Sequence, residues 1–120
     1  MAYFDRYLLF IEYFNKAKFM SAQTTLDEVW LDEEGENKNF YGGLIQVAVS
    51  LYHLTNENPK GATKIYEKAR TMLLPYGDKY FGIELGKLLK ECDHLYSKSE
   101  NTETSSLDYL KQVPRIDFRT

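Results

Sequence analysis

Five residues have the types and spacing that could line a binding groove on two expected helices: Gln23, Asp27, Trp30, Gln46 and His53. Amide, carboxylate, indole and imidazole groups all form hydrogen bonds. Gln46 and His53 lie two helical turns apart, about 10 Å along the axis, so they cannot share one ligand atom but can line opposite ends of a groove. The competing interpretation is that each satisfies another polar group inside the fold, as buried polar side chains normally do.

The same sequence offers little for catalysis or metal binding. Asp27 and Glu28 are adjacent, so on a helix they point about 100° apart and do not form a carboxylate pair; a solvated or salt-bridged role is the simpler one. With two histidines and one cysteine, a three-ligand nitrogen/sulfur zinc site would need all of them. Cys92 lies on an apolar stripe, as expected of an inert buried thiol, and His94 falls between apolar positions, towards the surface. No phosphate-binding loop or nucleophile elbow is present. We therefore expect no catalytic residue, no metal and no cofactor.

Composition indicates one globular domain of 120 residues, with 43% hydrophobic and 28% charged residues. The formal charge of −3 argues against nucleic-acid binding, which usually needs a clustered positive surface. A single cysteine excludes an internal disulfide and fits a reducing compartment. The N-terminal apolar run contains Asp5 and Arg6, so we do not expect it to act as a signal peptide, and no stretch is long enough to span a bilayer. These features favour the cytoplasm or the soluble phase of an organelle.

A nearly all-apolar helix over 38–54 is the element around which the fold is predicted to form. Helical spacing places Phe40, Leu44, Val47, Leu51 and Leu54 on one stripe, and Tyr41, Ile45, Ala48 and Tyr52 on the next. A helix that is apolar on most sides is buried on most sides. Gly42 and Gly43 cost helix propensity, and we expect them to allow close approach of a neighbouring backbone.

Four further helices are predicted around this one, giving an all-α bundle of five helices in antiparallel hairpins. They cover 3–16, 21–31 with Ser21 as N-cap, 59 onwards with Asn58 as cap, and a last helix capped by Asp78. The buried positions of the last helix are expected at Phe81, Leu85, Leu88, Cys92 and Leu95. Gly82 and Gly86, four residues apart, suggest a groove for a neighbouring helix. The helical domain is predicted to span 1–97.

Residues 98–120 are predicted to form a polar linker and a mobile C-terminal tail. The stretch 97–106 is too polar to order itself by burial. Large apolar side chains follow at Leu107, Tyr109, Leu110, Val113, Ile116 and Phe118. Such a patch would be sticky if it stayed exposed, so we expect it to dock. The long tether favours docking on a partner protein over docking on the chain's own domain.

Three segments in order, 19–30, 40–54 and 58–69, resemble the DUF309 family of small all-helical proteins of unassigned function. The likeness covers roughly the first four-fifths of the chain. It implies a compact bundle of helical hairpins, similar in look to tetratricopeptide repeats, and no reaction. The family typically carries a Glu-Ala-His-Glu element where this chain has Ser21, Ala22, Gln23 and Thr24. Neutral amides and hydroxyls are poor metal ligands and do not titrate near neutral pH, so an acid–base or metal site there could not operate in this chain.

The sequence therefore predicts a non-enzymatic protein-interaction module, by analogy with helical-hairpin folds that present grooves to peptides or helices. The alternative is a small-molecule or metal-dependent activity at the groove between the second and central helices. The absence of a titratable cluster favours the first.

Overall fold

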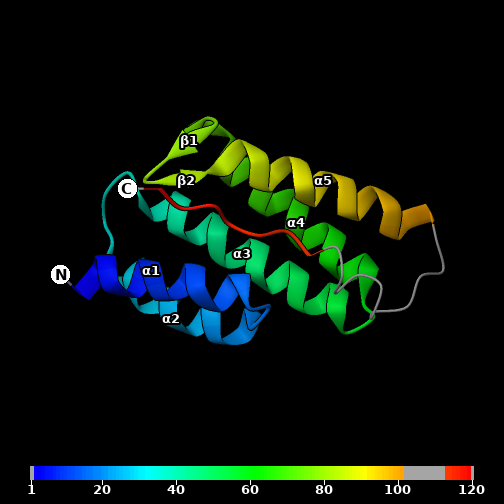
Figure 1. Ribbon diagram of the computed structural model, residues 1–120, viewed down its shortest axis with the longest axis horizontal. Helices are drawn as coiled ribbons and strands as arrows, with labels where there is room; N and C mark the ends of the chain where they lie inside the picture. Colours follow the sequence, from blue (N-terminus) through cyan, green and yellow to red (C-terminus); the bar gives the residue numbers. More distant parts are fainter. Residues whose placement is uncertain (1, 102–112, 120) are drawn as a thin grey trace.

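Five helices, one 3₁₀ turn and a small hairpin make up the described part of the chain, as the computed structural model shows (Figure 1). It describes residues 2–101 and 113–119, with side chains for all of these except 2, 3 and 99–101. The elements are α1 (Ala2–Asn15), α2 (Phe19–Asp32), α3 (Lys38–Thr55), α4 (Pro59–Leu73), η1 (Leu74–Tyr76), β1 (Lys79–Tyr80), β2 (Ile83–Glu84) and α5 (Leu85–Asn101). The all-α class and the five helices agree with the prediction.

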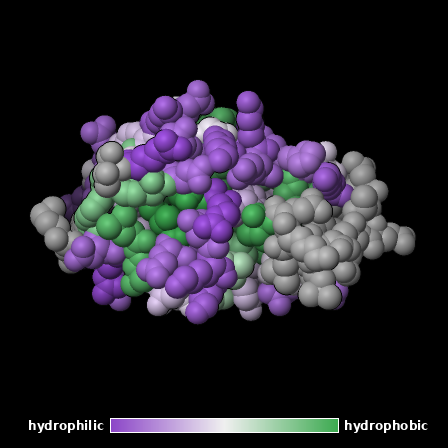
Figure 2. All heavy atoms as spheres, viewed as in Figure 1, coloured by the Kyte–Doolittle hydropathy of each residue, from purple (hydrophilic) through white to green (hydrophobic). Residues whose placement is uncertain are grey.

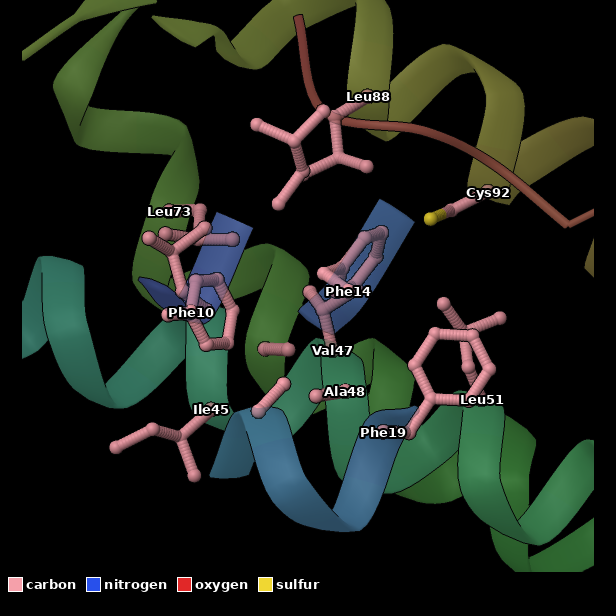
Figure 3. Packing of buried hydrophobic residues seen from close by; sticks show 14 of the residues in the cluster. Phe10, Phe14, Phe19, Ile45, Val47, Ala48, Leu51, Leu73, Leu88 and Cys92 are labelled. Atoms are coloured by element: carbon pink, nitrogen blue, oxygen red, sulfur yellow. The ribbon is translucent and has the colours of Figure 1, made fainter. Parts of the chain in front are cut away.

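Helix α3 is the buried centre. It packs against α2 on one side and α4 on another, and Figure 3 shows side chains from α1, α2, α4 and α5 converging on it. The whole predicted stripe is fully buried: Phe40, Leu44, Val47, Leu51 and Leu54. Tyr52 is the exception on the second stripe, because its side chain is 38% exposed. None of the helices in the described part of the chain is long and apolar enough to cross a membrane.

The two glycines of α3 make room for side chains of neighbouring helices, and not for a backbone as expected. A Cβ atom on Gly43 would lie 2.6 Å from the Leu73 side chain of α4. A Cβ atom on Gly42 would lie 2.9 Å from Met72 and 3.0 Å from the indole nitrogen of Trp30. Gly42 therefore sets how closely Trp30 can approach α3.

Helix α4 begins as predicted, whereas α2 does not. Asn58 accepts a hydrogen bond from the backbone of Gly61 at 3.2 Å and caps α4. Helix α2 starts at Phe19, after Lys18, so Ser21 lies inside the helix and is not its cap. Ala17 has a φ of 59°, which turns the chain sharply between the two helices. This tight turn lets Phe19 pack edge-on against Phe14 of α1, with ring centroids 5.3 Å apart.

A hairpin replaces the expected first turn of the last helix. β1 and β2 pair antiparallel around Phe81 and Gly82, whose φ values of 46° and 83° form a turn with two positive φ values. Tyr7 stabilises the turn by donating a hydrogen bond to the Phe81 carbonyl at 2.8 Å. Phe81 is therefore 40% exposed at a turn, and Gly82 does not join Gly86 in a helical groove. Both expectations are wrong, because tertiary contacts decide the local conformation here.

The C-terminal part of the chain also differs from the prediction. Helix α5 continues to Asn101, so residues 97–101 are helical and not linker. The rest of the predicted linker lies outside the described residues. The tail residues Leu107, Tyr109 and Leu110 lie outside them too. Residues 113–119 are extended and run back beside α5 towards β2 (Figure 1). Ile116 is 2% exposed and Phe118 packs against the core, so these two dock on their own domain and the preference for a partner is wrong for them.

Candidate functional site

A cleft of about 330 Å³ lies where α2, α3 and α4 meet. Each helix contributes residues from one face at helical spacing. Helix α2 provides Gln23, Asp27 and Trp30, helix α3 provides Gly42, Ile45 and Gln46, and helix α4 provides Lys68 and Met72. The packing of the helices explains the cleft. Helices α2 and α4 both pack on α3, and the cleft lies over α3 in the gap between them.

Four of the five predicted groove residues meet in this cleft: Gln23, Asp27, Trp30 and Gln46. His53 does not. Its ring lies against that of Tyr52, with centroids 5.7 Å apart, near the end of α3. Two helical turns separate it from Gln46, and the cleft is too short to include both.

The indole of Trp30 forms an apolar wall of the cleft and is held in place from two directions. One edge lies against Gly42, where any larger residue would displace it. Lys38 donates a hydrogen bond from Nζ to the Trp30 carbonyl at 2.8 Å, and the same nitrogen lies 4.3 Å from the centroid of the ring. Such a cation–π contact adds to the stability of the ring position. Trp30 is thus ordered without any ligand.

The polar groups of the cleft are unusual because they have no partners among the described residues. The side chains of Gln23, Asp27, Gln46 and Lys68 form neither hydrogen bonds nor ion pairs there. Asp27 is half-buried, and its burial raises the pKa of its carboxyl group above the ordinary value. Glu28, the next residue, is exposed and forms an ion pair with Arg6 at 2.8 Å. The two adjacent carboxylates therefore have different environments.

Residues from α4 were missed by the sequence analysis. Lys68 is exposed and belongs to the solvent side of that helix, whereas Met72 is half-buried. They lie one turn apart at the border between the solvent side and the buried side, where the helix faces the cleft. That these two residues face the cleft follows only from the packing of α4 on α3. The glycine pair of α3 is the one sequence signal that could have indicated a close neighbour at this point.

The cleft is lined by amide groups, one carboxylate and one ammonium group beside apolar side chains. Asp27 and Lys68 are its titratable residues. Within the part of the chain that the structure describes, no three of His, Cys, Asp and Glu gather into a possible metal site. Cys92 is fully buried, and burial raises the pKa of its thiol, as expected of an inert side chain. His94 is exposed on α5, as predicted.

A larger hollow of about 600 Å³ lies between α5 and residues 113–117, and it is the weaker candidate. Its lining is mostly exposed charged side chains, including Lys90 and Arg115, which a solvated surface also presents. One of its cations, Lys87, is already paired with Asp117. The smaller cleft is more enclosed and contains the unpartnered groups.

These observations define a small all-helical domain with a cleft between three of its helices. The family model described as "Domain of unknown function (DUF309)" matches residues 7–65, from α1 to the first part of α4. Over these residues the chain is similar to DUF309, in agreement with the resemblance seen in its sequence. The match includes the cleft residues of α2 and α3 and ends before Lys68 and Met72.

A similar protein from Aquifex aeolicus (strain VF5), described as an uncharacterized protein, is 28% identical over 96 residues. The matched part is 79% of this chain and 29% of that protein, so the chain spans less than a third of its relative. No solved structure gives a significant match.

Proposed function

We propose that this domain is a non-enzymatic protein-interaction module whose α2–α3–α4 cleft receives a basic side chain, arginine above all, from a partner protein. The observation that carries the proposal is the set of unpartnered polar groups of Gln23, Asp27 and Gln46 beside the ordered indole of Trp30. Half-buried groups without partners cost stability, and a ligand that binds them recovers that cost.

Arginine fits the chemistry of the lining. Its guanidinium has five N–H donors, which the carboxylate of Asp27 and the amide oxygens of Gln23 and Gln46 can accept. Hydrogen bonds that involve charged groups are the stronger ones, and a carboxylate is the best acceptor for a guanidinium. The aliphatic part of arginine can pack on Trp30, Ile45 and Met72 while its charged end reaches the polar groups. Lys68 is exposed on a flexible stem and can turn towards solvent.

The place of action is part of the same proposal. The single cysteine is buried and free, which fits a reducing environment. We infer the cytoplasm or the soluble phase of an organelle.

A second candidate is the binding of a free small molecule. The volume of about 330 Å³ is at the lower end of the range found for small-molecule sites. The lining includes a carboxylate, Asp27, and an ammonium group, Lys68, which together favour a zwitterion. A zwitterion would use both charges, whereas a partner's arginine side chain uses only Asp27.

Trp30 provides the test, because it is the only tryptophan of the chain and lies in the cleft. Its fluorescence is followed while N-acetyl-arginine amide is added to the full chain, with the neutral citrulline analogue as ligand control. We expect a saturable change with arginine, and Asp27→Asn should weaken binding by about 10-fold or more, as loss of a charged hydrogen bond does. Glu28→Gln is the matched control and should bind like wild type.

Two results would contradict the interaction module. The first is no saturable change in Trp30 emission, and the second is equal binding by Asp27→Asn and Glu28→Gln. Free arginine, which keeps its amino and carboxylate groups, separates the two candidates. Tighter binding of free arginine than of the blocked amide, lost in Lys68→Ala, would favour the small-molecule function.

A further inference from the structure

Residues 113–119 lie on the domain as a bound extended peptide would. Asn15 of α1 holds the main chain of Ile116 in both directions, donating from Nδ2 to the carbonyl at 2.9 Å and accepting from the N–H at 2.7 Å. On the other side the segment pairs with the hairpin. Glu84 N–H donates to the Asp117 carbonyl at 3.1 Å, and Arg119 N–H donates to the Gly82 carbonyl at 2.6 Å. These bonds use the peptide backbone and therefore do not depend on the sequence of the segment.

Three consecutive side chains of the segment enter three different environments. Ile116 is almost completely buried in the core. Asp117 forms an ion pair with Lys87 of α5. Phe118 packs against Phe4 and Tyr7 of α1, with ring centroids 6.1 Å and 6.2 Å away. The groove, made by α1, the hairpin and α5, thus accommodates an apolar, then an acidic, then an aromatic residue.

The chain's own segment does not fill the groove. A hollow of about 260 Å³ remains beside Phe118, lined by Phe4, Phe81, Gly82 and Arg119. Phe81 is 40% exposed at its edge. On the face shown in Figure 2, apolar surface gathers in the half of the molecule that carries the two chain ends, bordered by polar side chains. A segment with a larger aromatic residue in place of Phe118 would bury more of this surface.

We propose that this groove is a second docking surface, which binds an extended segment of a partner protein with the pattern apolar, acidic, bulky aromatic, and that residues 113–119 occupy it in competition. Addition of an extended segment to a sheet edge, with pockets for alternate side chains, is an established recognition mode. The proposal goes beyond the cleft function and shares none of its residues.

A partner fits better than a second copy of this chain. The chain's own segment is covalently joined to the domain, so its docking is intramolecular, with an effective concentration of about the millimolar range. A second copy offers the same contacts without that advantage and is outcompeted. A partner segment that fills the hollow beside Phe118 gains contacts that the chain's own segment lacks.

The test uses the full chain and a fluorescein-labelled peptide of the sequence of residues 113–120 with the substitution F118W. Anisotropy is measured with wild type and with a tail-released variant, Ile116→Asp with Phe118→Ser. We expect saturable binding of the peptide to the released variant. Binding to wild type should be at least about 10-fold weaker, because the chain's own segment competes for the groove. Adding Asn15→Ala to the released variant should abolish binding. A peptide that also carries I116D is the control and should not bind.

Absence of binding to a folded released variant would overturn the proposal, and so would equal binding to wild type and released variant. Hydrogen exchange of the wild-type chain tests the proposal even if the released variant fails to fold. The amides of Ile116 and Arg119 should exchange at least about 100-fold faster than that of Leu51, because a competitor can enter only if the segment opens without global unfolding. Equal rates would show that the segment is part of the core and would overturn the proposal. A dimer of wild type at micromolar concentration would assign the groove to a second copy instead.

Discussion

Ser50 and Gln46 lie one turn apart on α3, and their polar groups are used in opposite ways. Ser50 is fully buried, donates a hydrogen bond to the Val47 carbonyl at 2.8 Å and accepts one from the Tyr96 hydroxyl at 2.7 Å. Gln46 is half-buried in the cleft and has no partner among the described residues. The part of α3 around Ser50 and Leu51, here called the closed side, thus satisfies its polar group within the fold, whereas Gln46, one turn earlier on the cleft side, has no partner among the described residues.

The contrast extends to the neighbouring helices. Beside Tyr96, the hydrogen-bond partner of Ser50, the Tyr66 hydroxyl donates to the Asp93 carboxylate at 2.6 Å. The Arg70 Nε–H donates to the same carboxylate at 3.1 Å. The rings of Tyr66 and Tyr96 stack with centroids 4.7 Å apart. Burial raises the pKa of both phenols, so they stay neutral hydrogen-bond donors. Asp93 is therefore a structural carboxylate, while Asp27, on the cleft side, has no such network.

The largest effect on stability is expected from creating a cavity on the closed side of α3. Leu51→Ala should lower the free energy of unfolding by about 2–5 kcal/mol, because Leu51 is fully buried in a packed core. Chemical denaturation followed by circular dichroism measures it. A loss below about 1 kcal/mol would show that the core tolerates the cavity, and the closed side would not be the stabilising one.

Gly43→Ala should destabilise by about 1–3 kcal/mol, the usual cost of overpacking. The new Cβ atom would lie 2.6 Å from the Leu73 side chain, between α3 and α4. Gly42→Ala is the matched variant on the cleft side, where Trp30 can move. It should cost less stability and should shift the Trp30 emission, which Gly43→Ala should leave unchanged. The reverse pattern would contradict the assigned faces of α3.

Tyr96→Phe should cost about 0.5–1.5 kcal/mol, the net value of a typical hydrogen bond. It removes the donor to Ser50 and keeps the ring that stacks on Tyr66. The comparison variant is Gln46→Ala, which should change the free energy of unfolding by less than about 0.5 kcal/mol and weaken binding of N-acetyl-arginine amide. Equal destabilisation by the two substitutions would remove the distinction between the two sides.

The smallest effect concerns pH. A carboxyl group whose pKa is raised by folding is destabilising above that pKa, so Asp27 should reduce stability as the pH rises through its ordinary and then its raised value. Asp27→Asn should match wild type at about pH 3, where the carboxyl is protonated, and equal or exceed its denaturation midpoint at about pH 7. Lower stability of Asp27→Asn at neutral pH would reveal a stabilising partner for this carboxylate.

Periodicity was enough to predict that five helices form, but not the start of α2 or the two ends of α5. Contacts between distant residues explain the hairpin and the docked segment. The stripe of α3 follows from spacing alone, and the start of α4 follows from Asn58 and Pro59. The Phe81–Gly82 turn depends on Tyr7, 74 positions earlier, and the docking of Ile116 depends on Asn15, 101 positions earlier. Nothing in the local sequence reveals these pairs.

The candidate site was predictable to the extent that it lies on single helices. Gln23, Asp27 and Trp30 on α2 and Gln46 on α3 were all predicted for the groove. The structure brings these four together in one cleft. The contribution of Lys68 and Met72 required the packing of α4 on α3, which no sequence spacing gives. His53 was included because it lies on the same face of α3 as Gln46. The two residues are two turns apart, and the cleft does not extend that far along the helix.

Side-chain NMR of the wild-type chain tests the contrast most directly. N-acetyl-arginine amide is added while the side-chain amide signals of Gln23 and Gln46 and the Nε–H signal of Arg70 are followed. We predict saturable shifts for both glutamines, since they gain a partner, and no shift for Arg70, whose Nε–H is already bonded to Asp93. Unchanged glutamine signals at saturating arginine amide, or a shift at Arg70 alone, would contradict the assignment of the cleft as the binding side of this domain.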